Sequence, residues 1–241
     1  DAMRGWEGPR DDMGLFLGVG REPPDSGDAE PALAAACNDG VLDEHMLAGE
    51  GRDRYPPLLP LKTLPNMALA HISINLGIHG ENGIWTGDAG ASLRALAAGI
   101  WAVREGRVSA ALVGATDSLV DFGSARDRLR QESRLYAPGE GAAMLVLENL
   151  DSAWSSGRPI YGLLSPRSVD ETNNPLPLSS SLGDCGASMG VLAVVIACAA
   201  WSVGAVLVNP LSGNSLSHSR LLFSHVGNSC GAIELRSPGP C

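Results

Sequence analysis

The chain has 241 residues and a net charge of −10, and 44% of its residues are hydrophobic while 18% are charged. This composition suits a tightly packed globular domain and argues against a disordered chain. No stripe of Lys and Arg occurs in the sequence. Nucleic acid is therefore not expected as a partner, because neutralising phosphates needs clustered basic side chains.

Apolar strands and Ala-rich helices alternate along the chain, which predicts a layered α/β architecture. Strands are predicted at residues 14–19, 83–86, 109–114, 143–147, 160–164, 205–208 and 232–235. Helices are predicted at residues 30–37, 66–76, 89–104 and 187–201. The Pro-rich segment 55–65 is expected to form neither a regular helix nor a central strand, since each Pro lacks a backbone N–H.

Residues 187–208 are almost wholly apolar and approach the length of a membrane span. Gly190, Ser202 and Gly204 interrupt this run, which favours a buried helix that turns into a buried strand. We therefore expect no membrane segment. Because no signal peptide opens the sequence, we expect a cytoplasmic protein.

The five cysteines are irregularly spaced, and none lies in a C-x-x-C pair; they are Cys37, Cys185, Cys198, Cys230 and Cys241. This pattern supports neither a zinc site nor a disulfide framework. We expect neither a bound metal nor a cofactor.

Four longer stretches follow one another along the chain. They read NMALAHISINLGIHGENGIW from Asn66, ALAAGIWAVREGRVSAALVGATDS from Ala95, PGEGAAMLVLENLDSAWSSGRPIYGLL from Pro138 and VGNSCGAIEL from Val226. In type and order they resemble conserved stretches of the β-ketoacyl synthases. These are the segment before the nucleophile, the helix and strand after it, the Gly-Glu-Gly-Ala turn with its strand, and the closing Gly-rich turn. The resemblance implies a dimeric, thiolase-like fold of layered α-β-α-β-α type.

We expect one shortened, truncated ketosynthase-like domain over residues 1–241. Residues 1–65 match the family poorly and residues 66–164 match it best. Residues 165–178 form a linker in place of a deleted middle segment, and residues 179–241 are a remnant of the C-terminal half.

The side chains that catalyse the ketosynthase reaction are missing where the resemblance would place them. The family uses a Cys at a helix start to accept the acyl group, and two His residues to stabilise the charge that develops. Counting back from Gly106 puts the nucleophile at Ala89, and no Cys occurs between Cys37 and Cys185. The linker contains no His, and Asp184 stands at the place of the second His.

The resemblance therefore implies a non-catalytic partner subunit, similar to the chain-length factors of type II polyketide synthases. Such a subunit pairs with an active ketosynthase, shapes and stabilises its acyl tunnel, and meets the acyl carrier protein only through that partner. The dimer strand is expected at Asn82, Gly83, Ile84, Trp85 and Thr86. Candidates that line the acyl tunnel are Leu58, Leu59, Met67 and Leu69, for which ordinary core packing is the competing interpretation.

Three alternatives stay open. Cys185 lies at the start of an apolar helix, where a thiol pKa can fall, and could serve an acyltransferase or decarboxylase. Asp184 beside it opposes thiolate formation. The chain could also be a stand-alone acyl-binding module or a structural remnant.

The remaining polar candidates have plainer interpretations. Asp88 is expected to cap the helix that follows it, and Asp117 lies at a strand end. We expect His71 to be a packing residue and His79 a loop residue. For His218 and His225 a place in the core or on the surface is expected, because no base or metal partner is visible in the sequence.

Overall fold

The computed structural model describes residues 3, 6–21, 26–121, 124, 136–167, 182–202 and 232–236. The chain divides into two units. We call residues 1–21 and 69–241 the sheet unit, and residues 22–68 the small unit.

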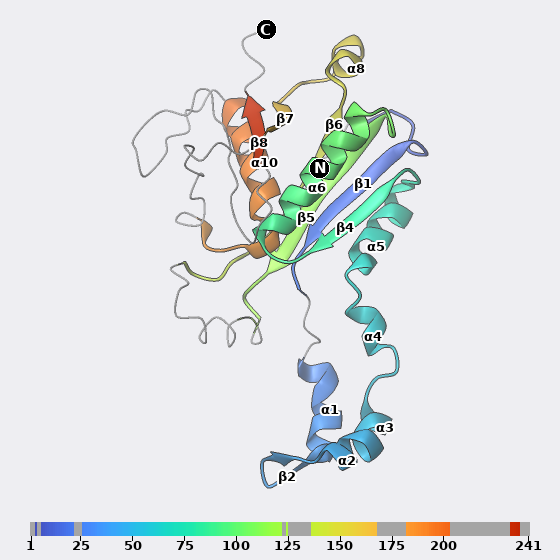
Figure 1. The fold of residues 1–241 in the computed structure, drawn as a ribbon, viewed down its shortest axis with the longest axis vertical. Coiled ribbons are helices and arrows are strands. Elements are labelled where there is room, and N and C mark those ends of the chain that lie inside the picture. Colours follow the sequence, from blue (N-terminus) through green and yellow to red (C-terminus); the bar gives the residue numbers. More distant parts are fainter. Residues whose placement is uncertain are drawn as a thin grey trace. The chain divides into compact units, whose positions relative to one another are not determined.

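A four-stranded, mostly parallel sheet organises the sheet unit (Figure 1). Its strands are β1 (Met13–Val19), β4 (Asn82–Thr86), β5 (Ala110–Ser118) and β6 (Glu140–Glu148), in the order β4-β1-β5-β6. β1 runs parallel to β4 and β5, and β6 runs antiparallel to β5. Every residue of β1 is buried, as expected of a central strand in a parallel sheet that is covered on both faces.

Two helices, α6 (Ala89–Arg104) and α10 (Met189–Ser202), pack against the sheet and against each other. α6 approaches the sheet closely because Gly99 faces Val113, where a Cβ on the glycine would lie 2.4 Å from a methyl group. The buried side chains of this core come from β1, α6, β5, β6 and α10 and from Val108 before β5, and the larger ones are Phe16, Leu96, Ile100, Val113, Val191 and Val194.

Shorter elements are also described in the sheet unit. α5 (Asn66–Leu76) begins in the small unit and continues into the sheet unit. α8 (Leu150–Ser155) follows β6 directly, and β7 (Leu163–Arg167) pairs antiparallel with β8 (Ala232–Arg236).

The small unit is built from short elements: α1 (Ser26–Ala36), the β2–β3 hairpin (Cys37–Asn38 and Val41–Leu42), α2 (Glu44–Met46), the π-helical turn η1 (Leu47–Gly51), α3 (Arg52–Arg54) and α4 (Leu59–Lys62). Among its described residues, the buried hydrophobic side chains are Ala32, Ala36 and Leu59. This unit therefore has very little core of its own.

The α/β fold expected from the sequence is confirmed, and α5 and α6 have their predicted bounds. The expectation for the Pro-rich segment was wrong, because α4 forms a single helical turn there. Pro60 lies in its first turn, where a missing N–H costs no hydrogen bond. The predicted strand at 160–164 begins only at Leu163, and the strand predicted at 205–208 lies outside the described residues.

α10 begins after the 3₁₀ turn η2 (Gly186–Ser188) and has 14 residues. Within the part of the chain that the structure describes, no helix is long and apolar enough to cross the membrane. The described part of the apolar run, residues 187–202, is packed against the sheet and α6.

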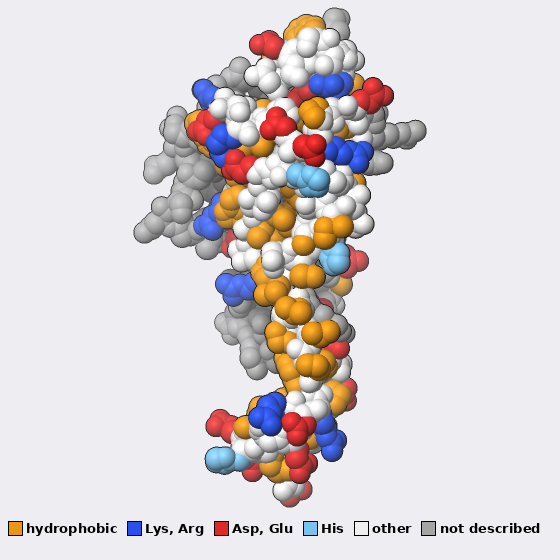
Figure 2. All heavy atoms as spheres, turned by 90° about the vertical axis from the view of Figure 1, so that its right-hand side faces the viewer, with side chains coloured by type: hydrophobic (Ala, Val, Ile, Leu, Met, Phe, Trp, Pro, Cys, Tyr) orange, Lys and Arg blue, Asp and Glu red, His pale blue; other side chains and the backbone are white. Residues whose placement is uncertain are grey.

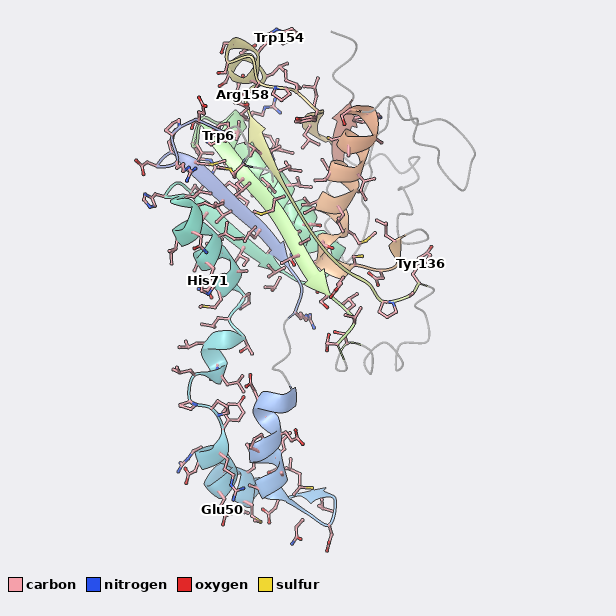
Figure 3. The ribbon with its side chains drawn as sticks, turned by 180° about the vertical axis from the view of Figure 1, so that it is seen from behind. Trp6, Glu50, His71, Tyr136, Trp154 and Arg158 are labelled. Atoms are coloured by element: carbon pink, nitrogen blue, oxygen red, sulfur yellow. The ribbon has the colours of Figure 1, made fainter. Side chains whose placement is uncertain are left out.

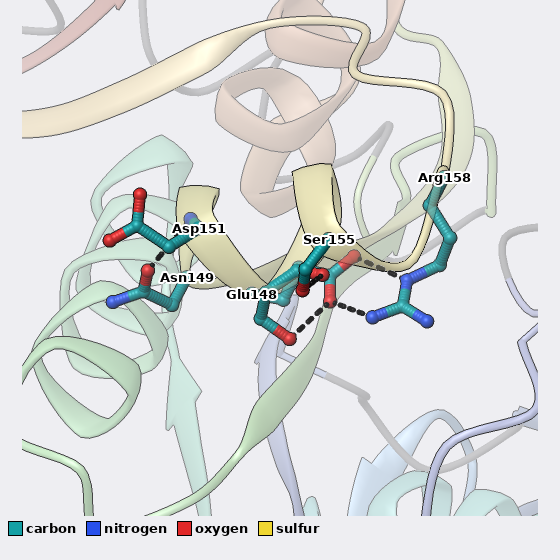
Figure 4. A network of polar contacts seen from close by, with 6 residues as sticks. Glu148, Asn149, Asp151, Ser155 and Arg158 are labelled. Atoms are coloured by element: carbon teal, nitrogen blue, oxygen red, sulfur yellow. Dashed lines mark hydrogen bonds and ion pairs between the residues drawn. The ribbon is translucent and has the colours of Figure 1, made fainter.

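An ion pair fixes the corner where β6 leads into α8 (Figure 4). Arg158 donates from Nε and an Nη to the two carboxylate oxygens of Glu148, at 2.8 and 2.5 Å. The Arg158 guanidinium also lies over the ring of Trp6, 4.9 Å from its centroid (Figure 3). The side chain of Asn149 caps α8 by accepting the N–H of Asp151. This corner therefore ties the N-terminal segment to the end of the sheet.

We expect Gly18→Ala to destabilise the sheet unit, because a Cβ at Gly18 would lie 2.5 Å from the backbone nitrogen of Ser92 in α6. Backbone cannot move aside as a side chain does, so the free energy of unfolding should fall by about 1–3 kcal/mol. Urea denaturation followed by circular dichroism measures it. Gly49→Ala is the control, since a Cβ there meets nothing within 4 Å and should change stability by less than about 1 kcal/mol. Equal effects of the two variants would contradict the prediction.

Candidate functional site

The turn between β4 and α6 is the place where the resemblance puts the catalytic nucleophile. Gly87 adopts a φ of 145°, and the Asp88 carboxylate accepts the N–H of Gly90 at 3.0 Å. Asp88 is therefore the N-cap of α6, as predicted. Ala89 is the first residue of α6, and its side chain lies outside the described part of the structure.

The first turn of α6 is held between β1 and α10. Ser92 is fully buried, and its Oγ accepts the N–H of Gly190 at 3.1 Å. Gly18 of β1 and Gly190 of α10 both approach Ser92 so closely that a Cβ on either would lie 2.5 Å from it. The first turn of α6 is thus packed tightly against β1 and α10.

Asp117, at the end of β5, joins the sheet to the start of η2. Its Oδ2 accepts the N–H of Ala187 at 2.7 Å. The carboxylate lies against Gly20 and Gly186, where an added Cβ would be within 1.8 and 1.9 Å of its oxygens. Burial raises the pKa of Asp117, the hydrogen bonds from Ala187 and Ser118 lower it, and the charges of Asp184 and Asp121 raise it further, with a net rise.

Asp184, at the place expected for the second catalytic His, caps the same turn. Its Oδ1 accepts the N–H of Gly186 at 3.0 Å. Its backbone pairs with the segment before β6, donating to Ala137 O at 2.8 Å and accepting from Gly139 N at 2.9 Å. Two carboxylates, those of Asp117 and Asp184, therefore satisfy free N–H groups at the start of η2. The carboxylate charges that raise the pKa of Asp117 are those of Asp184 and Asp121.

Cys185 is a buried thiol with a raised pKa. It is 4% exposed, and its Sγ lies 3.7 Å from the backbone oxygens of Glu140 and Leu182, to which it can donate. Burial is the largest cause of the raised pKa, followed by the charges of Asp184 and Asp117. Gly139 makes room for the sulfur, since a Cβ there would lie 3.0 Å from it. These surroundings favour the thiol over the nucleophilic thiolate.

The other described cysteines and histidines stand apart from this cluster. Burial raises the pKa of Cys198 to about 11, whereas Cys37 is exposed. His71 is exposed on α5, so its expected packing role was wrong; α5 has no buried residue among those described (Figure 3). His79 lies in a loop as predicted, 2.9 Å from Asp11.

His218 and His225 lie outside the described residues, as does most of the 165–178 linker. Among the residues that are described, no three His, Cys, Asp or Glu side chains come together as a metal site would require.

The predicted interface and tunnel residues fall on both units. β4 is an edge strand, paired with β1 on one side. Trp85 packs inside the chain, with its ring 6.4 Å from that of Phe16, and is partly exposed. Leu58 is exposed and Leu59 is buried, while Met67 and Leu69 are half-buried. The roles of these residues across an interface stay predictions.

Sequence reasoning missed the contacts that close the site. The hydrogen bond between Ser92 and Gly190 joins residues that are 98 positions apart. The bond between Asp117 and Ala187 joins residues that are 70 positions apart. The only sequence signal was the set of small residues at Gly18, Gly20 and Gly190, which marks close approach of two backbones.

We expect Asp117→Asn to stabilise the chain at neutral pH. A carboxyl group with a raised folded pKa binds its proton more tightly in the folded chain, so the wild type loses stability as the pH rises through that pKa. Asn keeps an acceptor for Ala187 without the charge, and its advantage should vanish as the pH falls below the pKa of an unfolded Asp. Asp117→Ala instead leaves the N–H unpaired and should cost about 1–3 kcal/mol. Thermal unfolding across a pH series measures both, and an advantage of Asn that grows towards low pH would refute the assignment.

The chain resembles ketosynthases in sequence and in fold. It is 29% identical over 143 residues to the 3-oxoacyl-[acyl-carrier-protein] synthase 2 of Synechocystis sp., a match that covers 51% of this chain and 34% of the relative. A synthase of the same name from Staphylococcus aureus is 29% identical over 133 residues, covering 48% and 33%. The chain thus matches about a third of the length of these relatives.

A solved structure shares the fold at low sequence identity. It is that of a type II polyketide synthase acyl-carrier protein in complex with its ketosynthase bound to the hexaketide. The TM-score is 0.51 at 19% identity, over 66% of this chain and 46% of the other. This likeness supports a thiolase-like sheet with its covering helices.

Residues 5–135, more than half of the chain, match the family model of the β-ketoacyl synthase N-terminal domain. With the strand–turn–helix at Ala89 and the mostly parallel sheet in place, the chain belongs to the β-ketoacyl synthase family.

Proposed function

We propose that the chain is a non-catalytic ketosynthase-like subunit that pairs with an active ketosynthase. One observation carries the proposal: α6 begins at Ala89, at the turn where the family places its nucleophile, and Ala has no group that could form a thioester. An acyl-enzyme therefore cannot form at this turn, and condensation needs a thiol from another polypeptide.

The charges around the turn support the same proposal. Decarboxylation of a malonyl thioester develops negative charge, which ketosynthases stabilise with hydrogen-bond donors. Here Asp117 and Asp184 bring carboxylates to the neighbouring η2 turn. Carboxylates repel a developing enolate, so this arrangement serves structure and not condensation.

The partner and the role follow from the family. The edge strand β4 offers one unpaired side among the described strands, which suits strand pairing across a dimer axis. In this proposal the subunit resembles a chain-length factor: it stabilises the active ketosynthase and shapes its acyl tunnel through Leu58, Leu59, Met67 and Leu69. An acyl carrier protein then meets the complex through the active partner, since the net charge of this chain is −10.

Co-expression with a full-length active ketosynthase from the same genome tests the pairing. We expect a stable 1:1 complex on size exclusion with light scattering, and no ketoacyl product from this chain alone with acyl and malonyl thioesters. Within the complex, Met67→Trp should shorten the main product, because added bulk in a tunnel ends elongation earlier. Ile74→Trp, on the same helix at an exposed position, is the control and should leave the product unchanged.

Three outcomes would favour the alternatives. Condensation by the chain alone would refute the proposal. A stable homodimer that retains acyl groups would favour an acyl-binding module. The absence of any complex with the ketosynthase would favour a structural remnant.

Thiol labelling tests the alternative of an enzyme that acts through Cys185. Among the described cysteines, we expect iodoacetamide to modify exposed Cys37 first, and Cys185 and Cys198 much more slowly, because burial raises the pKa of both thiols and the charges of Asp184 and Asp117 raise that of Cys185 further. Peptide mass spectrometry across a pH series measures each rate. Asp184→Asn should speed labelling of Cys185 by removing one charge and leave Cys198 unchanged. Rapid acylation of Cys185 by an acyl thioester, with turnover, would sink the non-catalytic assignment.

A further inference from the structure

The β2–β3 hairpin is closed by a two-residue loop, Asp39–Gly40. Both residues have a positive φ, 51° for Asp39 and 78° for Gly40, as a type I′ turn requires. Both are exposed, and a Cβ on Gly40 would meet nothing within 4 Å. Figure 2 shows charged side chains on the surface of the segment from α1 to α3, which holds this hairpin. Water therefore reaches the backbone of the loop.

An Asp that precedes Gly can react with the backbone of its own chain. The Gly nitrogen bonds to the Asp Cγ, the Cγ–OH bond of the protonated carboxyl breaks, and the N–H proton leaves with the hydroxyl as water. The product is a five-membered succinimide. A second water adds either to Cγ, which restores Asp, or to the former backbone carbonyl, which leaves isoaspartate. Gly is the most reactive successor, because it has no side chain that shields the attacking nitrogen.

The turn holds Asp39 one rotation away from the geometry of ring closure. In a flat ring the Gly nitrogen lies in the plane of Cα, Cβ and Cγ. For an L residue this requires a ψ of about −120°, the value at position i+1 of a type II′ turn. That position also has a φ of about 60°, and the φ of Asp39 is already 51°. Turning the one peptide plane between Asp39 and Gly40 therefore suffices, and Gly40 tolerates the change in sign of its own φ.

Asn82–Gly83 is the other place in the sequence where Asn or Asp precedes Gly, and there the structure opposes the same reaction. Both residues lie in β4, where they pair with Leu15 and Phe16 of β1. A parallel strand has a ψ of about 115°, so ring closure needs a rotation of about 120° that would pull Gly83 out of the ladder. The ring of Trp85 also lies over Gly83, at 2.7 Å from where its Cβ would be.

We propose that Asp39 is a site of spontaneous covalent modification, at which Gly40 converts it through a succinimide into isoaspartate, while β4 protects Asn82 from the same chemistry. The reaction needs no enzyme and no reagent except water. Isoaspartate therefore accumulates with the age of each molecule. The inference does not depend on the proposed function, because it follows from the turn alone.

Isoaspartate at this position should loosen the hairpin. It adds a methylene group to the backbone of a two-residue loop, and the loop then no longer matches the pairs that face each other in β2 and β3. Little else holds the hairpin in place, since the described buried hydrophobic side chains of the small unit are Ala32, Ala36 and Leu59.

The first experiment incubates the purified full-length chain at neutral pH, folded or unfolded in guanidinium chloride. Peptide mass spectrometry with electron-transfer fragmentation separates isoaspartate from Asp, and the mass detects loss of ammonia at Asn82. Asp39 should isomerise in the folded chain within about threefold of its rate in the unfolded chain, because an exposed turn rearranges at little cost. Asn82 should react at least about tenfold more slowly in the folded chain, because β4 must open first.

The unfolded chain provides the internal control. Once β4 is gone, Asn82 should react faster than Asp39, because an uncharged amide is attacked more readily than a carboxylate anion. Folding thus reverses the order of the two sites. An Asp39 that isomerises only after unfolding would overturn the inference, and so would equal rates at Asn82 in the folded and unfolded chain.

The second experiment changes the loop and keeps its turn. Gly40→Asn places a residue that tolerates positive φ after Asp39 and shields the attacking nitrogen, so isomerisation should slow several-fold. Asp39→Asn should instead speed ring closure at neutral pH, with release of ammonia. Circular dichroism checks that both variants fold.

Hydrogen exchange measures the consequence for the hairpin. Amides of residues 37–42 should exchange faster in the aged wild type than in fresh protein, and aged Gly40→Asn should match its own fresh sample. Faster ring closure in Gly40→Asn than in the wild type would overturn the assignment of the reacting nitrogen. Isoaspartate at Asp39 without faster exchange would overturn the predicted loss of pairing between β2 and β3.

Discussion

The close approach of β1 to the first turn of α6 is the constraint on which the rest of this site depends. Gly18 lets the backbone of Ser92 lie where a Cβ would otherwise be, and Gly190 brings α10 against the same serine. These contacts fix the direction in which α6 leaves the turn at Asp88. The turn before Ala89, which the resemblance matches to the nucleophile turn of the family, is therefore held by close contacts of Gly18 and Gly190 with Ser92.

Two carboxylates, those of Asp117 and Asp184, occupy the backbone N–H groups at the start of η2. A ketosynthase site gathers hydrogen-bond donors around the place where negative charge develops. In this chain the N–H groups of Gly186 and Ala187 are already engaged by Asp184 and Asp117. The carboxylates also raise the pKa of Cys185, the thiol nearest to them in the chain. The N–H of Ala187 is therefore used to hold the start of η2 to the end of β5.

The sequence predicted what local patterns determine and missed what distant contacts determine. The bounds of α6 were predictable because Asp88 caps its start, apolar residues recur at helical spacing, and Gly106 follows its end. The contact of Asp117 with Ala187 joins residues 70 positions apart, and no local pattern reports it. At Cys185 the expected opposition of Asp184 to a thiolate is confirmed, since burial and then the charges of Asp184 and Asp117 raise the pKa of the thiol. η2 is a three-residue turn whose small dipole is outweighed by burial and two carboxylates.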